Sequence, residues 1–141
     1  METHTPGIIE GYKELAAAII GQAVNDFMNA LISDDRRRIR EGREFFRSEY
    51  FGILSDKVTG EALIEKCTRI AAEVRAFEYQ LFRTDQTKKD DVHELICCIS
   101  DQCLLYTRKH LKRNRFVLKS TKKALLKEMY KRKLEKYIYF R

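Results

Sequence analysis

Residues 61–83 read EALIEKCTRIAAEVRAFEYQLFR, and this stretch decides the fold class. Its apolar positions recur at alternating steps of four and three residues, which is the spacing of one face of an α-helix. These positions are Leu63, Cys67, Ile70, Val74, Phe77 and Leu81. The pattern lasts for almost three heptads, which is short for a coiled coil and typical of a helix in an antiparallel bundle.

The chain around this stretch contains little that interrupts helices. All six glycines and the one proline lie within the first 60 residues. The remaining 81 residues contain neither, and they are rich in Leu, Ala, Lys, Arg and Glu. Because turns depend heavily on Gly and Pro, this composition predicts long helices. We therefore expect an all-α fold, a single-domain helical bundle of about five helices with a basic C-terminal helix.

Two helices are expected before the deciding stretch. The first covers about residues 8–31, and periodicity places its apolar face at the core. This face comprises Tyr12, Leu15, Ile19, Ala23, Phe27 and Ala30. The second helix begins after a cap at Ser33 or Asp34 and keeps one apolar face as far as Ile53.

The deciding stretch itself forms the third expected helix, and the loop before it ends at Thr59, which can cap that helix. Two more helices are expected after the stretch. A polar linker, residues 84–90, precedes a fourth helix whose start has Asp91 and Glu94 at capping-box spacing. The buried stripe of the fourth helix is Val92, Ile96, Ile99, Cys103, Tyr106 and His110. A fifth helix follows a cap at Ser120, with a narrower apolar stripe of Leu126, Tyr130, Leu134 and Tyr137.

Charge is divided unevenly along the chain. Residues 1–101 carry 14 Lys and Arg against 19 Asp and Glu, although the net charge of the whole chain is +7. Residues 102–141 carry 14 Lys and Arg against only two Glu. The helices over 8–84 are thus mildly acidic, and those over 90–141 are strongly basic from residue 102. An excess of this size attracts polyanions at long range whatever the fold.

Apolar runs and cysteine spacing narrow the class of protein. The longest apolar runs are far shorter than a bilayer span and no signal sequence opens the chain, so we expect a soluble, cytoplasmic protein of a host cell without a membrane partner. The cysteines lack the spacing of a disulfide framework, which indicates reduced thiols used as small core residues. They are Cys67, Cys97, Cys98 and Cys103.

The sequence has no complete catalytic or metal motif. There is no Gly-rich phosphate loop, nucleophile elbow or Ser/His/Asp arrangement, so we expect neither an enzyme nor a cofactor. A nuclease built from carboxylates on different helices is the enzymatic alternative. His93-Glu94-Leu95-Ile96-Cys97 is partly similar to the H-E-x-x-H zinc motif, but Cys97 replaces the second His and no third ligand is evident. We therefore predict no metal, and the alternative is a structural metal bound by Cys97, Cys98, Cys103 or His110.

One segment carries a resemblance to known proteins. EFFRSEYF at residues 44–51 is followed by Leu54-Ser55-Asp56 and then by Gly60-Glu61-Ala62-Leu63-Ile64. This order resembles a family of small uncharacterised proteins of Firmicutes phages and prophages, over roughly residues 8–72. Those relatives usually have Asp-Gly-Glu where this chain has Thr59-Gly60-Glu61. The resemblance implies a phage or mobile-element accessory protein, and it implies no particular activity.

The basic C-terminal third contains the stronger candidate site. Its cations are interleaved with aromatic residues, as on non-specific nucleic-acid surfaces, where cations neutralise phosphates and rings stack on bases. We name as the C-terminal basic group Arg108, Lys109, Lys112, Arg113, Arg115, Lys119, Lys122, Lys123 and Lys127. Lys122 and Lys123 follow the expected helix cap, where the helix dipole disfavours cations. Their position therefore favours a binding function over a stabilising one.

A second candidate site lies on the second expected helix. Four arginines follow one another at helical spacing along one edge, where they can bind phosphates or carboxylates. We name as the N-terminal arginine group Arg36, Arg40, Arg43 and Arg47. The favoured alternative is that they pair with Glu44, Glu49 or an acidic neighbouring helix and only solvate the surface.

Three functional interpretations follow. We expect a non-enzymatic phage-type accessory protein that binds nucleic acid or a host nucleoprotein through the C-terminal basic group. The alternative is a protein-directed inhibitor of a bacterial defence nucleoprotein, of the anti-CRISPR type. The third interpretation is a structural protein that forms homo-oligomers. A pulldown with bare DNA and RNA, compared with one from a host lysate, separates the first two.

Overall fold

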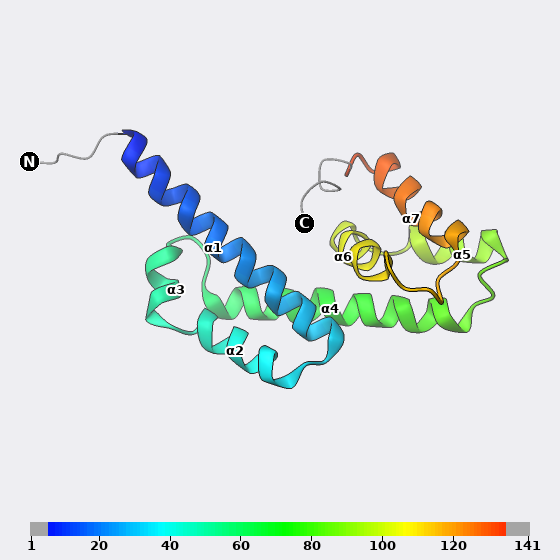
Figure 1. Cartoon of the computed structure of the whole chain (residues 1–141), viewed down its shortest axis with the longest axis horizontal. Helices are drawn as coiled ribbons and strands as arrows, with labels where there is room; N and C mark the ends of the chain where they lie inside the picture. The colour runs from blue at the N-terminus through cyan, green and yellow to red at the C-terminus, as the bar shows by residue number, and fades with distance from the viewer. Residues whose placement is uncertain (1–5, 135–141) are drawn as a thin grey trace, which may run out of the picture. The chain divides into compact units, whose positions relative to one another are not determined.

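Helices account for all the regular structure from residue 6 to residue 134, the residues that the computed structural model describes (Figure 1). They are α1 (Pro6–Ser33), α2 (Arg36–Phe46), α3 (Glu49–Leu54), α4 (Gly60–Arg83), α5 (Lys89–Cys97), α6 (Asp101–Leu111) and α7 (Lys119–Lys131). The predicted all-α class is therefore confirmed. The predicted number of about five helices is wrong, because two of the expected helices are each divided in two.

The second expected helix is divided at Ser48. The Ser48 hydroxyl accepts a hydrogen bond from the Phe51 N–H at 3.2 Å and so caps a new helix, α3. The cap of α2 is Asp35, one residue later than expected, and its carboxylate accepts from the Arg38 N–H at 3.3 Å. The division buries Phe51 and leaves Ile53 81% exposed, so the predicted apolar face is wrong at its C-terminal end.

The fourth expected helix is divided at Ser100. The Ser100 hydroxyl accepts from the Cys103 N–H at 3.2 Å and caps α6. Both polar groups of Ser100 also donate to the Glu73 carboxylate of α4, the N–H at 2.9 Å and the Oγ at 2.6 Å. Because Glu73 occupies the hydrogen-bonding groups of Ser100, the chain changes direction there instead of continuing one long helix.

The other predicted caps have mixed outcomes. Thr59 is confirmed, since its hydroxyl accepts from the Ala62 N–H at 3.1 Å. The capping box beginning at Asp91 is wrong, because α5 starts earlier, after Lys88, without a side-chain cap. Ser120 does not cap α7 either, because that helix begins after Leu118.

The chain contacts separate two units within α4. One unit ends at Arg69 and comprises α1, α2, α3 and the first part of α4, whereas the other begins at Ile70 and comprises the rest of α4 with α5, α6 and α7. We call them the N-terminal unit and the C-terminal unit. The sequence analysis separated helices over 8–84 from helices over 90–141, and the linker between these two groups lies inside the C-terminal unit.

The N-terminal unit is built around packed rings. After a short turn, α2 returns beside α1 (Figure 1), and α3 completes this side of the core. Phe27 of α1, Phe46 of α2 and Phe51 of α3 are buried. The Phe46 ring meets the other two edge to face, with centroids 5.5 and 5.4 Å apart. Gly42 permits the close approach of α1 and α2, because a Cβ there would overlap the Phe27 ring.

The N-terminal half of α1 differs from the prediction. Tyr12 and Leu15, predicted on the buried face, are 69% and 58% exposed, whereas Phe27 and Ala30 are buried as predicted. Glu10–Ser33 has the length and the mean hydropathy, 1.4, of a helix that can cross a membrane. Core helices and signal sequences have the same length and composition, so these two properties do not assign the helix to a membrane.

The C-terminal unit has its core where α7 lies beside α5 and α6 (Figure 1). The predicted stripe of α4 is buried in this unit at Val74, Phe77 and Leu81, and in the N-terminal unit at Cys67. Its other two predicted members, Leu63 and Ile70, are half-buried. Within α7 the predicted stripe is displaced by one residue, since Leu125 and Met129 are buried while Leu126 is half-buried and Tyr130 is 53% exposed. Leu134, beyond the end of the helix, is buried as predicted. Tyr137, also predicted in that stripe, lies outside the described residues.

Candidate nucleic-acid interface

One guanidinium group holds the end of α7 against the junction of α5 and α6. Arg132 donates to the Glu128 carboxylate at 2.7 Å and to the Asp101 carboxylate at 3.2 Å. It also donates to three carbonyl oxygens at 2.8 to 3.3 Å, those of Ile96, Cys97 and Ile99. Carbonyls at the end of a helix lack helical partners and carry partial negative charge, so a cation there both satisfies and neutralises them.

The hydrogen bonds of Arg132 also occupy the Glu128 carboxylate. Burial acts to lower the pKa of Arg132, but its hydrogen bonds to Glu128 and Asp101 outweigh that effect and the pKa is raised. Glu128 is the single acidic residue in the described range 102–134, and it is buried. Because Glu128 is bonded to Arg132, it does not neutralise the lysines of α7.

The connection between α6 and α7 is held by a glutamine from outside both helices. The Gln86 side-chain oxygen accepts from the Leu118 N–H at 2.9 Å and from the Thr121 hydroxyl at 3.0 Å. The Gln86 side-chain nitrogen donates to the Phe116 carbonyl at 3.2 Å, and the Phe116 N–H donates to the Asn114 side chain at 2.8 Å. Both backbone polar groups of Phe116 are thus occupied, which fixes the conformation of the connection.

A histidine joins α6 to α4. His110 Nδ1 lies 2.6 Å from Glu78 Oε2, and this hydrogen bond raises the pKa of His110 above its ordinary value, against the opposing effect of desolvation. The His110 side chain is 42% exposed, so its predicted burial is wrong. The contact joins the last turn of α6 to α4.

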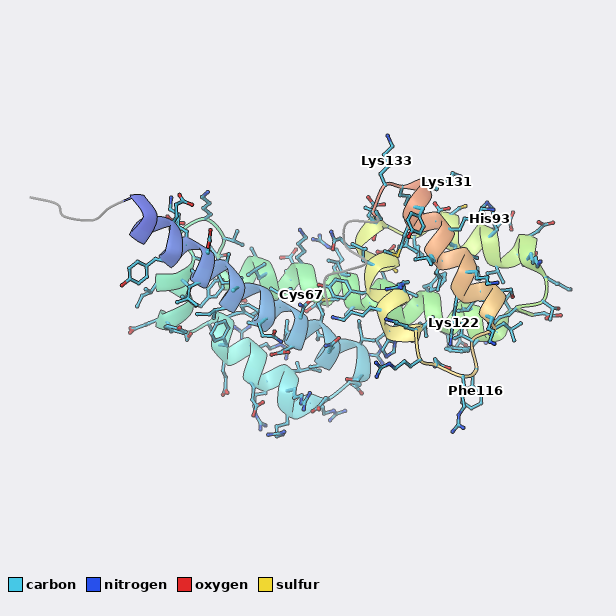
Figure 2. The ribbon with its side chains drawn as sticks, turned by 45° about the horizontal axis from the view of Figure 1, so that its top comes forward. Cys67, His93, Phe116, Lys122, Lys131 and Lys133 are labelled. Atoms are coloured by element: carbon cyan, nitrogen blue, oxygen red, sulfur yellow. The ribbon has the colours of Figure 1, made fainter. Side chains whose placement is uncertain are left out.

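Four cations, from the C-terminal end of α6 with its cap residue and from α7, line a cavity of about 160 Å³. Its floor is apolar and consists of Leu111, Leu125 and Leu126. The basic residues that line it are Arg108, Lys112, Lys122 and Lys123, and Lys122 is labelled in Figure 2. None of the lining residues is acidic. The structure therefore brings the end of α6 and the start of α7 together as one positively charged site.

The rest of the C-terminal basic group lies outside this cavity. These five residues are exposed, and they are Lys109, Arg113, Arg115, Lys119 and Lys127. Within residues 6–134 none of the five forms an ion pair with a carboxylate. Exposed cations without such partners add to the positive potential around the cavity.

Phe116 is one of the aromatic residues interleaved with the cations, and the prediction did not include it among the site residues. Its ring is 74% exposed and projects away from the ribbon at the connection of α6 and α7 (Figure 2). The Arg115 guanidinium carbon lies 6.0 Å from the ring centroid. The sequence signal was an aromatic residue between arginines and a lysine, but the sequence does not say whether such a ring is buried.

One member of the N-terminal arginine group forms an ion pair within the fold, and the other three lie at the surface without one in the described part of the chain. Arg47 binds the Glu61 carboxylate of α4 through two nitrogens, and this hydrogen bond raises the pKa of Arg47 and lowers that of Glu61. The acidic partner differs from Glu44 and Glu49, which were expected. The remaining three are exposed and form no ion pair with any described carboxylate: Arg36, Arg40 and Arg43.

The cysteines divide into two buried and two exposed residues. Burial raises the pKa of the Cys67 and Cys103 thiols to about 11, which agrees with their predicted core role. Cys97 and Cys98 are exposed, so the core prediction is wrong for them. His93 Nε2 lies 3.2 Å from Cys97 Sγ. Among the described residues, no three His, Cys, Asp or Glu side chains are grouped to hold a metal ion.

Comparison with known proteins gives no match. No protein-family model, no curated protein and no solved structure matches the chain. The resemblance to phage proteins therefore stays a prediction, and the site is interpreted from its own chemistry.

Proposed function

We propose that the protein binds nucleic acid, either bare or within a nucleoprotein, through the C-terminal basic group. The observation that carries this proposal is the convergence of cations from α6 and α7 around a cavity with no acidic lining residue. Phosphate groups are the natural ligands of such a surface, because each neutralised phosphate releases condensed counterions. Binding through phosphates requires little sequence preference.

The start of α7 supports a binding function over a purely stabilising one. Lys119 and Lys122 lie in its first turn and Lys123 follows directly, at the end where the helix dipole is positive. The same turn contains no acidic residue, and Leu118 provides no side-chain cap. These cations therefore do not stabilise the free helix, whereas a bound phosphate would meet both the cations and the free N–H groups.

A triple substitution tests the proposal. In Lys122→Gln, Lys123→Gln, Lys127→Gln we expect weaker binding to a labelled oligonucleotide in fluorescence anisotropy. Over a salt series, the slope of log affinity against log salt should flatten by up to about three contacts, each worth roughly 0.7 to 0.9. Thermal stability should be unchanged or slightly higher, because the start of α7 loses unfavourable charge.

The matched control removes the same charge from the other candidate site. Arg36→Gln, Arg40→Gln, Arg43→Gln should leave affinity and salt slope almost unchanged. If this variant weakens binding and the lysine variant does not, the interface lies on α2 and the proposed site is wrong. If no DNA or RNA binds at low salt, the proposal fails, and a host protein captured through the same lysines would support the inhibitor interpretation.

A further inference from the structure

Phe116 is the most exposed aromatic residue of the described chain, and leaving it in water is unfavourable. Phe116 is 74% exposed, and Leu118, two residues further on, is 41% exposed. Apolar surface in water costs roughly 25 cal/mol per Å², so this ring contributes little to folding in its present position. A ligand that covers the ring would recover that free energy.

The ring is also held in place before any ligand arrives. The Phe116 N–H donates to Asn114 and the Phe116 carbonyl accepts from Gln86. The Gln86 side-chain oxygen also accepts from the Leu118 N–H, so hydrogen bonds hold the backbone at Phe116 and on its C-terminal side. A fixed backbone lowers the entropy cost of binding, because the connection does not have to become ordered.

Charge around the ring indicates the class of ligand. The connection that contains Phe116 also contains Arg113 and Arg115, and the first residue of α7 is Lys119. All three cations are exposed. The Arg115 guanidinium carbon lies over the ring, 6.0 Å from its centroid, which places a cation able to bind phosphate beside the stacking surface. An apolar, flat and cationic surface is complementary to a base joined to phosphates.

Single strands fit this surface better than duplexes. In a duplex the base faces are stacked on each other, and exposing one costs a few kcal/mol. In a single strand the faces are available, and aromatic side chains bind them with little sequence preference. A duplex would use the cations and leave the Phe116 ring without a partner.

We infer that the nucleic acid bound by this site is single-stranded, with one base stacked on Phe116 and the neighbouring phosphates held by the C-terminal basic group. This inference rests on the proposed function, whose cations it shares. Phe116 provides the preference for single strands, and the cations provide the salt dependence.

Phe116→Ala separates stacking from charge. Affinity for a labelled oligothymidine should fall by about 5- to 140-fold, the range expected for loss of one stacked base. The salt slope should stay at the wild-type value, because stacking releases no condensed counterions. Affinity for a blunt duplex of the same length should be unchanged. The matched control is Tyr12→Ala, which removes a ring that is 69% exposed in the N-terminal unit and should have no effect.

Phe116→Trp provides a direct optical test, because the chain contains no tryptophan. Its fluorescence should be quenched by the oligothymidine and not by the duplex. If wild-type protein binds both ligands equally and Phe116→Ala weakens neither, the inference is wrong while the proposed function stands. If neither DNA nor RNA binds in any form, both are overturned.

Discussion

Rings pack against one another in the N-terminal unit, whereas polar side chains tie helix ends together in the C-terminal unit. Every ring pair in the described chain involves Phe27, Phe45, Phe46, Tyr50 or Phe51. All three buried polar residues of residues 10–134 lie in the C-terminal unit, and they are Thr107, Thr121 and Glu128. Ring packing sets how closely helices approach, while hydrogen bonds set where each helix begins and ends.

This difference explains why the candidate interface lies in the C-terminal unit. Its three last helices contain 9, 11 and 13 residues. Helices of this length are marginal in isolation, so they depend on contacts with the rest of the fold. Arg132, Gln86 and Glu73 supply directional contacts at their ends. The same contacts fix the positions from which the cations and Phe116 face solvent.

The largest expected effect comes from removing the hydrogen bonds and ion pairs of Arg132. Arg132→Met should destabilise the C-terminal unit by about 3 to 5 kcal/mol, because it leaves the buried Glu128 carboxylate without its partner. Hydrogen exchange followed by mass spectrometry should show lost protection in α5, α6 and α7, with the α1 to α3 segments unchanged. The control is Lys131→Met on the exposed side of α7, which should change stability by less than about 0.5 kcal/mol. Equal stability of the two variants would contradict the stabilising role of Arg132.

A smaller effect is expected where α4 meets α2 in the N-terminal unit. Gly60→Ala places a Cβ onto the carbonyl group of Phe46, and backbone atoms cannot rotate away as a side chain can. Overpacking of this kind costs about 1 to 3 kcal/mol, and exchange protection should fall in the N-terminal unit. Gly21→Ala is the control, since nothing lies within 4 Å of that position and a helical alanine stabilises by about 0.5 to 1 kcal/mol. The comparison fails if both alanines shift the melting temperature in the same direction.

The smallest expected effect is a pH dependence of the C-terminal unit. The pKa of His110 is raised in the folded chain by its hydrogen bond to Glu78. The stabilisation is therefore complete below the unfolded pKa, about 6.5, and it is lost as the pH rises through the higher folded pKa. Melting followed from pH 5.5 to pH 9 should show this loss in wild type, and His110→Gln should flatten it. An identical pH profile in the variant would exclude His110 as the cause.

Within the candidate site, the sequence identified the cations and missed their arrangement. The charge excess from residue 102 is visible in composition alone, and charged side chains remain at the surface in any fold because burying them is costly. That Arg108 and Lys122 line the same cavity depends on how α6 and α7 pack. The exposure of Phe116 depends on Gln86, which is 30 residues away in the chain.

The all-α class and four of the six predicted buried positions of α4 were determined by the sequence itself, because helical periodicity and a lack of Gly and Pro act locally. Only the tertiary structure decided where the helices break. A serine within a helical pattern is compatible with continuation and with a cap, and its hydroxyl caps only if the preceding chain turns away. At Ser100 the helical pattern ends and a new helix begins because the Glu73 carboxylate accepts hydrogen bonds from the Ser100 N–H and hydroxyl. Glu73 is distant in the sequence, so no local pattern of residues predicts this contact.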